Sequence, residues 1–166
     1  MKPPLSILVT DTSIWIDLHH GGILPEFFQL PYRIVATDLA ANREFHRPGW
    51  QALESLGLEI VELDPDQVVE LVQLRAQYPT LSVADLSAFI VARDLDGFLL
   101  TGDQRLRRMA KRFGVRAHGV LWCLDQLVTS GIVEPMAASV SLNQIIMRGA
   151  RLPDREIKRR LNEWEG

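Results

Sequence analysis

Short apolar runs alternate along this chain with longer segments in which apolar residues recur at helical spacing. The runs at 7–10, 58–63 and 98–101 predict strands, and 115–117 predicts a short last strand. Residues 32–37 are ambiguous between strand and helix. Strands that alternate with helices are typical of an α/β domain built on a parallel sheet.

Helices are predicted between the strands, and several begin at capping residues. Asp64 followed by Pro65 places an N-cap before a proline at the first helical position, and Ser82 with Asp85 has the spacing of a capping arrangement. One helix is predicted to start at 13, and another to end before Gly114. The other predicted helices are 38–45, 50–56, 65 to about 78, 82–94, 121–129, 136–148 and 154–164.

The apolar spacing also predicts which helix faces are buried. The expected core faces are Val68, Leu71, Val72 and Arg75 in one helix, and Leu106, Met109, Ala110 and Phe113 in another.

The chain of 166 residues has the length and composition of one folded domain, with 47% hydrophobic and 23% charged residues. We expect a core domain over 1–133 and a C-terminal helical extension over 134–166. In this extension four apolar residues lie near helical spacing, and their face could pack on the domain, on a second copy or in a partner groove: Leu152, Ile157, Leu161 and Trp164.

Cysteine usage and hydropathy indicate a cytoplasmic protein. Cys123 is the only cysteine, so neither an internal disulfide nor a cysteine zinc cluster is expected, and its apolar helix predicts a core position. No stretch approaches the ~20 apolar residues that span a bilayer, so we expect no membrane association.

Basic residues gather in two windows of a mildly acidic chain. Residues 103–112 carry five basic residues and one acidic residue, and residues 151–160 carry five and two, although the net charge is −3. Such windows suit local phosphate contacts, and they are equally the pattern of two solvated helix faces.

Three aspartates lie where the predicted elements would bring them together. Asp11 follows the first strand, Asp103 follows the strand at 98–101, and Asp85 lies in the first turn of a helix. In open parallel sheets a site forms outside the carboxyl ends of the strands. Clustered carboxylates repel one another unless a cation neutralises them, and Mg²⁺ and Mn²⁺ prefer oxygen ligands.

Each of these acids also has a purely structural interpretation. Asp11, Asp85 and Asp103 could serve only as helix caps. Glu44 is a candidate fourth carboxylate, but a helical glutamate is most often a solvated surface residue, and Asp38 competes for the same role.

Taken in order, three segments resemble motifs of the PIN-domain family of metal-dependent nucleases, most closely its toxin-like members of the VapC kind. Residues 8–18 (LVTDTSIWIDL) are similar to the opening strand and helix, residues 81–92 (LSVADLSAFIVA) to the central acidic helix, and residues 99–106 (LLTGDQRL) to the most recognisable motif. The resemblance covers about Ile7 to Val133.

The resemblance implies a Rossmann-like three-layer α/β/α sandwich with a parallel sheet. It also implies a Mg²⁺ or Mn²⁺ site at Asp11, Asp85 and Asp103, with Glu44 as the further catalytic acid, and endoribonuclease activity on RNA. Glu44 precedes Phe45 where the family usually has leucine, so Asp38 stays an alternative. Toxin-like members are held inactive by a small antitoxin and often form homodimers.

The resulting hypothesis is metal-dependent attack of water on an RNA phosphodiester, with no protein nucleophile. Thr101 or Ser13 would hydrogen-bond a carboxylate or a water, and Arg105 and Arg108 would guide the RNA backbone. The alternative function is a non-catalytic module with a PIN-like fold that binds nucleic acid or protein.

Other sites fit the sequence less well. The histidines His19, His20 and His46 lack the spacing of a helical metal site, and no glycine-rich nucleotide loop is present. A receiver-like signalling domain would need an acidic pair on the first strand and a late lysine, and neither is evident. The four tryptophans are expected to pack rather than to stack on bases.

Overall fold

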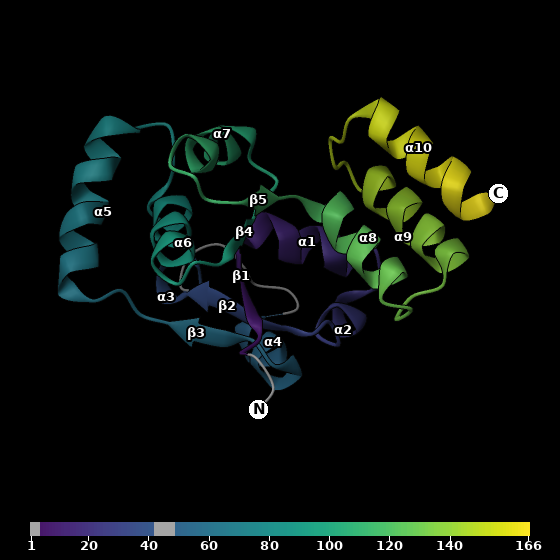
Figure 1. Cartoon of the computed structure of the whole chain (residues 1–166), viewed down its shortest axis with the longest axis horizontal. Coiled ribbons are helices and arrows are strands. Elements are labelled where there is room, and N and C mark those ends of the chain that lie inside the picture. The colour runs from purple at the N-terminus through teal and green to yellow at the C-terminus, as the bar shows by residue number, and fades with distance from the viewer. Residues whose placement is uncertain (1–3, 42–48) are drawn as a thin grey trace.

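A computed structural model describes residues 4–41 and 49–166 and places five parallel strands in one sheet (Figure 1). The strands are β1 Ser6–Thr10, β2 Tyr32–Thr37, β3 Glu59–Val61, β4 Phe98–Leu100 and β5 Ala117–His118. Their spatial order is β3-β2-β1-β4-β5, and every pairing is parallel. The predicted α/β fold is confirmed, and the ambiguous segment 32–37 is a strand next to β1.

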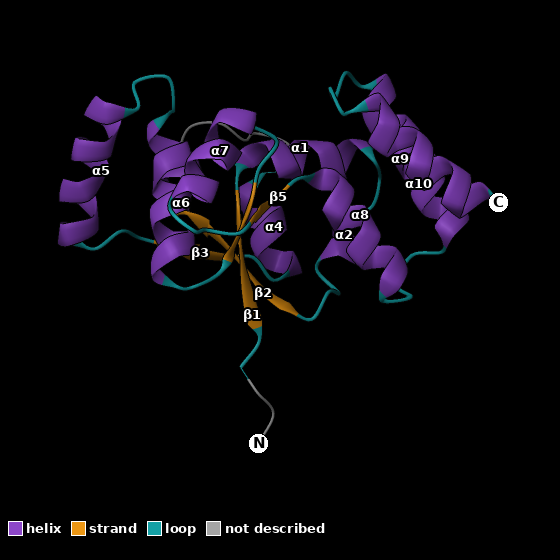
Figure 2. Cartoon of the chain, turned by 45° about the horizontal axis from the view of Figure 1, so that its top comes forward, coloured by secondary structure: helices purple, strands orange, loops and turns teal. Residues whose placement is uncertain are grey.

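Helices cover both faces of the sheet (Figure 2). They are α1 Thr12–His20, α2 Leu24–Phe27, α3 Asp38–Ala41, α4 Trp50–Leu56, α5 Pro65–Gln77, α6 Val83–Asp94, α7 Gln104–Arg112, α8 Val120–Thr129, α9 Pro135–Met147 and α10 Asp154–Glu165. Figures 1 and 2 show α5, α6 and α7 on one side of the strands and α1, α8, α9 and α10 on the other. The three layers expected of a Rossmann-like sandwich are therefore present.

The inner parts of β1, β2 and β4 are mostly apolar because helices bury both of their faces. Successive residues of β1 point to opposite faces: Leu8 packs in the cluster that contains Trp15, and Val9 packs in the cluster that contains Phe89. All four side chains are fully buried. The sheet is thus the shared wall of two hydrophobic cores.

Helix starts follow the predicted caps. Asp64 and Gln67 form a capping box at α5, and Ser82 and Asp85 form another at α6. Asp103 caps α7 by accepting hydrogen bonds from two backbone N–H groups.

Three of the sequence-based expectations are wrong in detail. In α5 the buried positions are Leu71 and Leu74, whereas Val72 is 67% exposed, because α5 packs mainly against α6. Phe113 lies beyond the end of α7 as its C-cap and is 49% exposed. The last strand is shifted to 117–118, where its partners are in β4.

The C-terminal helices pack onto the domain itself. Leu142 and Ile145 of α9 and Trp164 of α10 belong to the same hydrophobic cluster as Trp15. Arg160 of α10 also donates to both carboxylate oxygens of Asp125 in α8, at 2.9 and 2.6 Å. Of the three partners considered for this segment, the structure shows the domain. No helix among the described residues is long and apolar enough to cross a membrane.

We predict that Leu142→Ala destabilises the whole protein in one cooperative unfolding transition, because Leu142 is fully buried in the shared core. The expected loss is about 2–5 kcal/mol, measured by urea denaturation followed by circular dichroism. The matched control is Val140→Ala on the exposed face of α9, which should change stability by about 0.5 kcal/mol or less. Two separate transitions would contradict a shared core.

Candidate active site

The candidate site lies where the order of the strands reverses. β1 is the first strand of the chain, and its neighbours are β2 on one side and β4 on the other, so the crevice between β1 and β4 is the topological switch point. Asp11 directly follows β1, and the turn 101–103 directly follows β4. Both predicted strand-end aspartates therefore lie at the same edge of the sheet.

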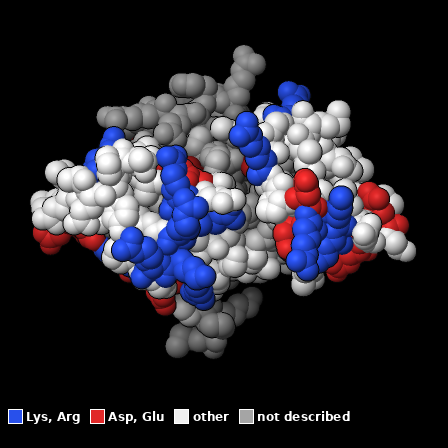
Figure 3. Space-filling view, turned by 90° about the horizontal axis from the view of Figure 1, so that it is seen from above, with Lys and Arg blue, Asp and Glu red and all other residues white. Residues whose placement is uncertain are grey.

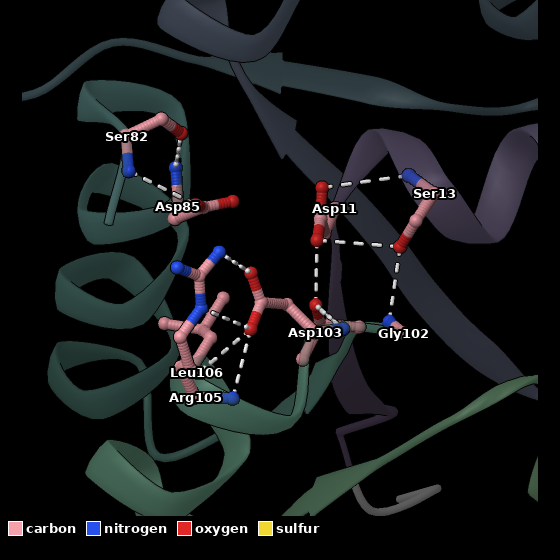
Figure 4. Close-up of polar contacts among 9 residues, drawn as sticks. Asp11, Ser13, Ser82, Asp85, Gly102, Asp103, Arg105 and Leu106 are labelled. Carbon is pink, nitrogen blue, oxygen red and sulfur yellow. Dashed lines mark hydrogen bonds and ion pairs between the residues drawn. The ribbon is translucent and has the colours of Figure 1, made fainter. Parts of the chain in front are cut away.

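Asp11 is held at this edge by several donors. Its side chain is nearly buried, with 7% of the residue exposed. One carboxylate oxygen accepts hydrogen bonds from the Thr101 hydroxyl at 2.5 Å and the Ser13 hydroxyl at 3.3 Å, and the other accepts from the Ser13 backbone N–H (Figure 4). Asp11 is thus both a candidate site residue and the N-cap of α1.

Two hydroxyl groups connect the turn after β1 to the turn after β4. Thr101 Oγ1 donates to Asp11 and accepts the Asp103 backbone N–H at 3.0 Å. Ser13 Oγ donates to Asp11 and accepts the Gly102 N–H at 2.9 Å. The expectation that these hydroxyls bind a carboxylate is confirmed for both residues.

The carboxylate of Asp103 faces Arg105. It accepts the N–H groups of Arg105 and Leu106 as the α7 cap, and the Arg105 guanidinium lies 3.3 Å from its other oxygen. Partial burial acts to raise the pKa of Asp103, but the hydrogen bonds and charge of Arg105 outweigh burial and hold the pKa below its ordinary value. This carboxylate is therefore ionised at neutral pH.

Asp85 approaches from the N-terminus of α6. It is half-buried, and one of its oxygens accepts the Ser82 N–H at 3.0 Å. In Figure 4 the other oxygen points across toward Asp11, and the Arg105 guanidinium lies between Asp85 and Asp103. A side-chain cation therefore stands beside these acids.

The fourth acid is expected at Glu44, with Asp38 as the alternative. Glu44 lies outside the described residues. Asp38 directly follows β2, the other neighbour of β1, and one of its oxygens is buried without a hydrogen-bond partner among the described residues. Within 4–41 and 49–166, no three acidic, histidine or cysteine side chains are close enough to hold a metal ion together.

The comparisons with known proteins decide the family. A model of a PIN domain family matches residues 7–166. This chain belongs to the PIN domain family. A solved PilT N-terminus domain protein from the hyperthermophilic archaeon Sulfolobus solfataricus P2 has a similar fold, with a TM-score of 0.50 and 18% identity over 72% of this chain and 91% of that chain. No curated protein sequence matches.

PIN domains are generally nucleases, so the candidate site at the switch point lies in a nuclease-type fold. The family match extends through α9 and α10, the segment that the resemblance of motifs did not cover.

Next to this site the PIN domain presents a band of basic side chains along α7 (Figure 3). Arg105 binds Asp103, whereas Arg108 is exposed and makes no ion pair with the described residues. On the other half of the same face, the basic side chains over α10 are interleaved with acidic ones. The α7 band is therefore the larger uncompensated positive surface in this view.

The sequence analysis missed Asp17, which lies one helical turn from Ser13 on the same face of α1. Burial raises the pKa of Asp17 to about 6. The spacing from Ser13 was a usable signal, because residues four apart on a helix lie side by side. Cys123, by contrast, is fully buried with a raised thiol pKa, which confirms its core position.

We predict that Asp17→Asn stabilises the protein at neutral pH. Because the folded-state pKa is about 6 against an ordinary value of 3.8, the folded state retains a proton that the unfolded chain releases, and stability falls as pH rises through this interval. The expected gain at pH 7.5 is about 1–2 kcal/mol, discounted for the carboxyl's contact with solvent. Below about pH 4 the gain should vanish in urea denaturation. A gain that is equal at both pH values would contradict this origin.

Proposed function

We propose that this PIN domain is an endoribonuclease that depends on Mg²⁺ or Mn²⁺ and cleaves RNA phosphodiester bonds. The observation that carries the proposal is the position of Asp11 and Asp103 at the switch point, where both are tied to the hydroxyl of Thr101. Asp85 reaches the same region from α6. Family membership supports a nuclease over other uses of this edge.

The donor chemistry suits a hard divalent cation. Asp11, Asp85 and Asp103 offer carboxylate oxygens only, the ligand type that Mg²⁺ and Mn²⁺ prefer. Asp103 would hold such a cation together with Asp11 and Asp85, and its partner in the structure is the Arg105 guanidinium. When bound, such a cation lowers the pKa of a coordinated water and stabilises charge on the phosphate oxygens.

The protein's own groups then orient the reactants. In hydrolysis the water oxygen bonds to phosphorus, one ester P–O bond breaks, and a proton reaches the leaving alcohol. Thr101 and Ser13 fix the direction of the Asp11 carboxylate through their hydroxyl donors, so that this acid keeps one geometry through the reaction. No protein nucleophile is required.

Positive charge next to the acids would bring the RNA backbone to them. Arg105 and Arg108 lie on α7 just beyond Asp103, and their guanidinium groups suit phosphate oxygens.

We assign the further acidic position to Glu44, with Asp38 as the alternative. The position of Asp38 directly after β2 favours Asp38 as an alternative member of the acidic site. Activity lost in Glu44→Gln and kept in Asp38→Asn would support Glu44.

The role as the toxin of a toxin–antitoxin pair is a further part of the proposal. It rests on the resemblance of the motifs at 8–18, 81–92 and 99–106 to toxin-like PIN domains. On this hypothesis a small antitoxin would bind the protein, and the protein would be a cytoplasmic homodimer.

We predict that Asp11→Asn abolishes metal-dependent cleavage of a mixed RNA pool, by about 100-fold or more, while the fold is kept. Asparagine retains an oxygen that accepts the Thr101 and Ser13 hydroxyls and caps α1, but it loses the negative charge. Cleavage is measured with Mg²⁺, with Mn²⁺ and with EDTA, after circular dichroism has shown equal folding.

The matched control is Asp66→Asn, an exposed acid in the first turn of α5, which should cleave like the wild type. Cleavage retained by folded Asp11→Asn would overturn the assignment of the site. RNA binding without cleavage in any metal would instead favour a non-catalytic binding module.

A further inference from the structure

A cavity of about 480 Å³ opens beside the candidate active site, between the domain and its C-terminal helices. Ser13 and Gly102 line it on the active-site side, and 150–153 and Glu156 line it on the other. This volume is within the range of small-ligand pockets. Ser13 lines the cavity and its hydroxyl donates to Asp11, so the cavity lies next to the acidic edge of the sheet.

One wall of the cavity carries a cation without a protein partner. The side chain of Arg107 makes no hydrogen bond or ion pair with any residue in the described part of the chain, and Arg107 lines the cavity. Its guanidinium lies against the backbone of Gly119: a Cβ added there would be 3.1 Å from Nη1. The first residues of α8 line the same wall, and no side chain caps this helix. This wall favours an anion.

The remaining charges of the cavity differ in their availability. Arg160 is bound by Asp125 and Glu156 at 2.6 and 2.9 Å, so its charge is compensated, and these three groups together carry a net charge of −1. Asp17, whose pKa burial raises to about 6, also lines the cavity. Arg151, in the loop between α9 and α10, is exposed at the rim and has no ion pair with the described residues. Arg107 and Arg151 are therefore positive charges available to a ligand from opposite sides.

The cavity also contains a flat aromatic pair. The rings of His118 and Trp122 stack with centroids 4.6 Å apart and planes 8° from parallel, and both residues line the cavity. Burial, together with the charges of Arg116 and Arg107, lowers the pKa of His118, which favours the neutral ring. Anionic contacts and an aromatic surface in one cavity match the two parts of a nucleotide, its phosphate and its base.

We propose that this cavity is an RNA subsite that holds a nucleotide adjacent to the scissile phosphate, with Arg107 and Arg151 on its phosphate and the His118–Trp122 pair beside its base. The proposal rests on the endoribonuclease function proposed above. It gives the C-terminal helices a functional role, because the loop 150–153 forms the outer wall. A strand of RNA is favoured over a free nucleotide because Ser13 both lines the cavity and binds Asp11, so a nucleotide in the cavity would lie next to the candidate active site.

The test measures binding separately from cleavage. Affinity for a short fluorescein-labelled single-stranded RNA is measured by anisotropy in EDTA, for wild type, Arg107→Gln, Arg151→Gln and the double variant. The double variant should bind about tenfold more weakly or worse, with a shallower dependence on salt. The matched control is Arg155→Gln, an exposed arginine four residues from Arg151 that does not line the cavity, and it should bind within about twofold of wild type.

A second readout locates the RNA. Photo-crosslinking of 4-thiouridine RNA should label peptides that contain 117–122 and 150–156 in wild type and less in the double variant. Calorimetric titration with adenosine monophosphate alone distinguishes an RNA subsite from a site for free nucleotides. If adenosine monophosphate binds as tightly as the RNA, the cavity is a site for free nucleotides and the RNA subsite is overturned.

The two proposals fail in different ways. If wild type cleaves RNA while the double variant binds and cleaves like Arg155→Gln, the subsite is wrong and the nuclease stands. If no variant cleaves but RNA binding still depends on Arg107 and Arg151, the cavity is an RNA-binding site, and the nuclease function and the placement beside a scissile phosphate are wrong.

Discussion

The hydroxyl of Thr101 holds the functional edge of this molecule together. It is fully buried, donates to Asp11 and accepts the Asp103 N–H, so it links the end of the first strand to the turn after the fourth. These segments are about 90 residues apart in sequence, and the pairing of β1 with β4 brings them into register. The position of Asp11 relative to Asp103 depends on this contact.

Each of the three acids of the candidate site also serves a helix. Asp11, Asp85 and Asp103 accept backbone N–H groups at the starts of α1, α6 and α7, where the helix dipole favours negative charge. The structural and functional interpretations of these residues are therefore compatible. Capping fixes the position of each carboxylate, and Arg105 supplies positive charge beside Asp103.

The sequence predicted most of this edge because each feature depends on local order along the chain. Asp11 and Asp103 follow buried strands, and parallel strands end at a common edge. The sequence could not predict which face of α5 is exposed, because the burial of each residue depends on how α5 packs against α6. The sequence could not predict the cavity either, because Arg107 and Arg151 come from segments whose proximity depends on how α9 and α10 dock.

The ion pairs of Arg160 have a consequence for how that cavity would work. They clamp α10 to α8, so the outer wall is ordered before any ligand arrives. Ligand binding then costs little conformational entropy of the protein, and the interaction energy remains available for affinity and for positioning the ligand. A receptor of this kind recognises its ligand by fit rather than by folding around it.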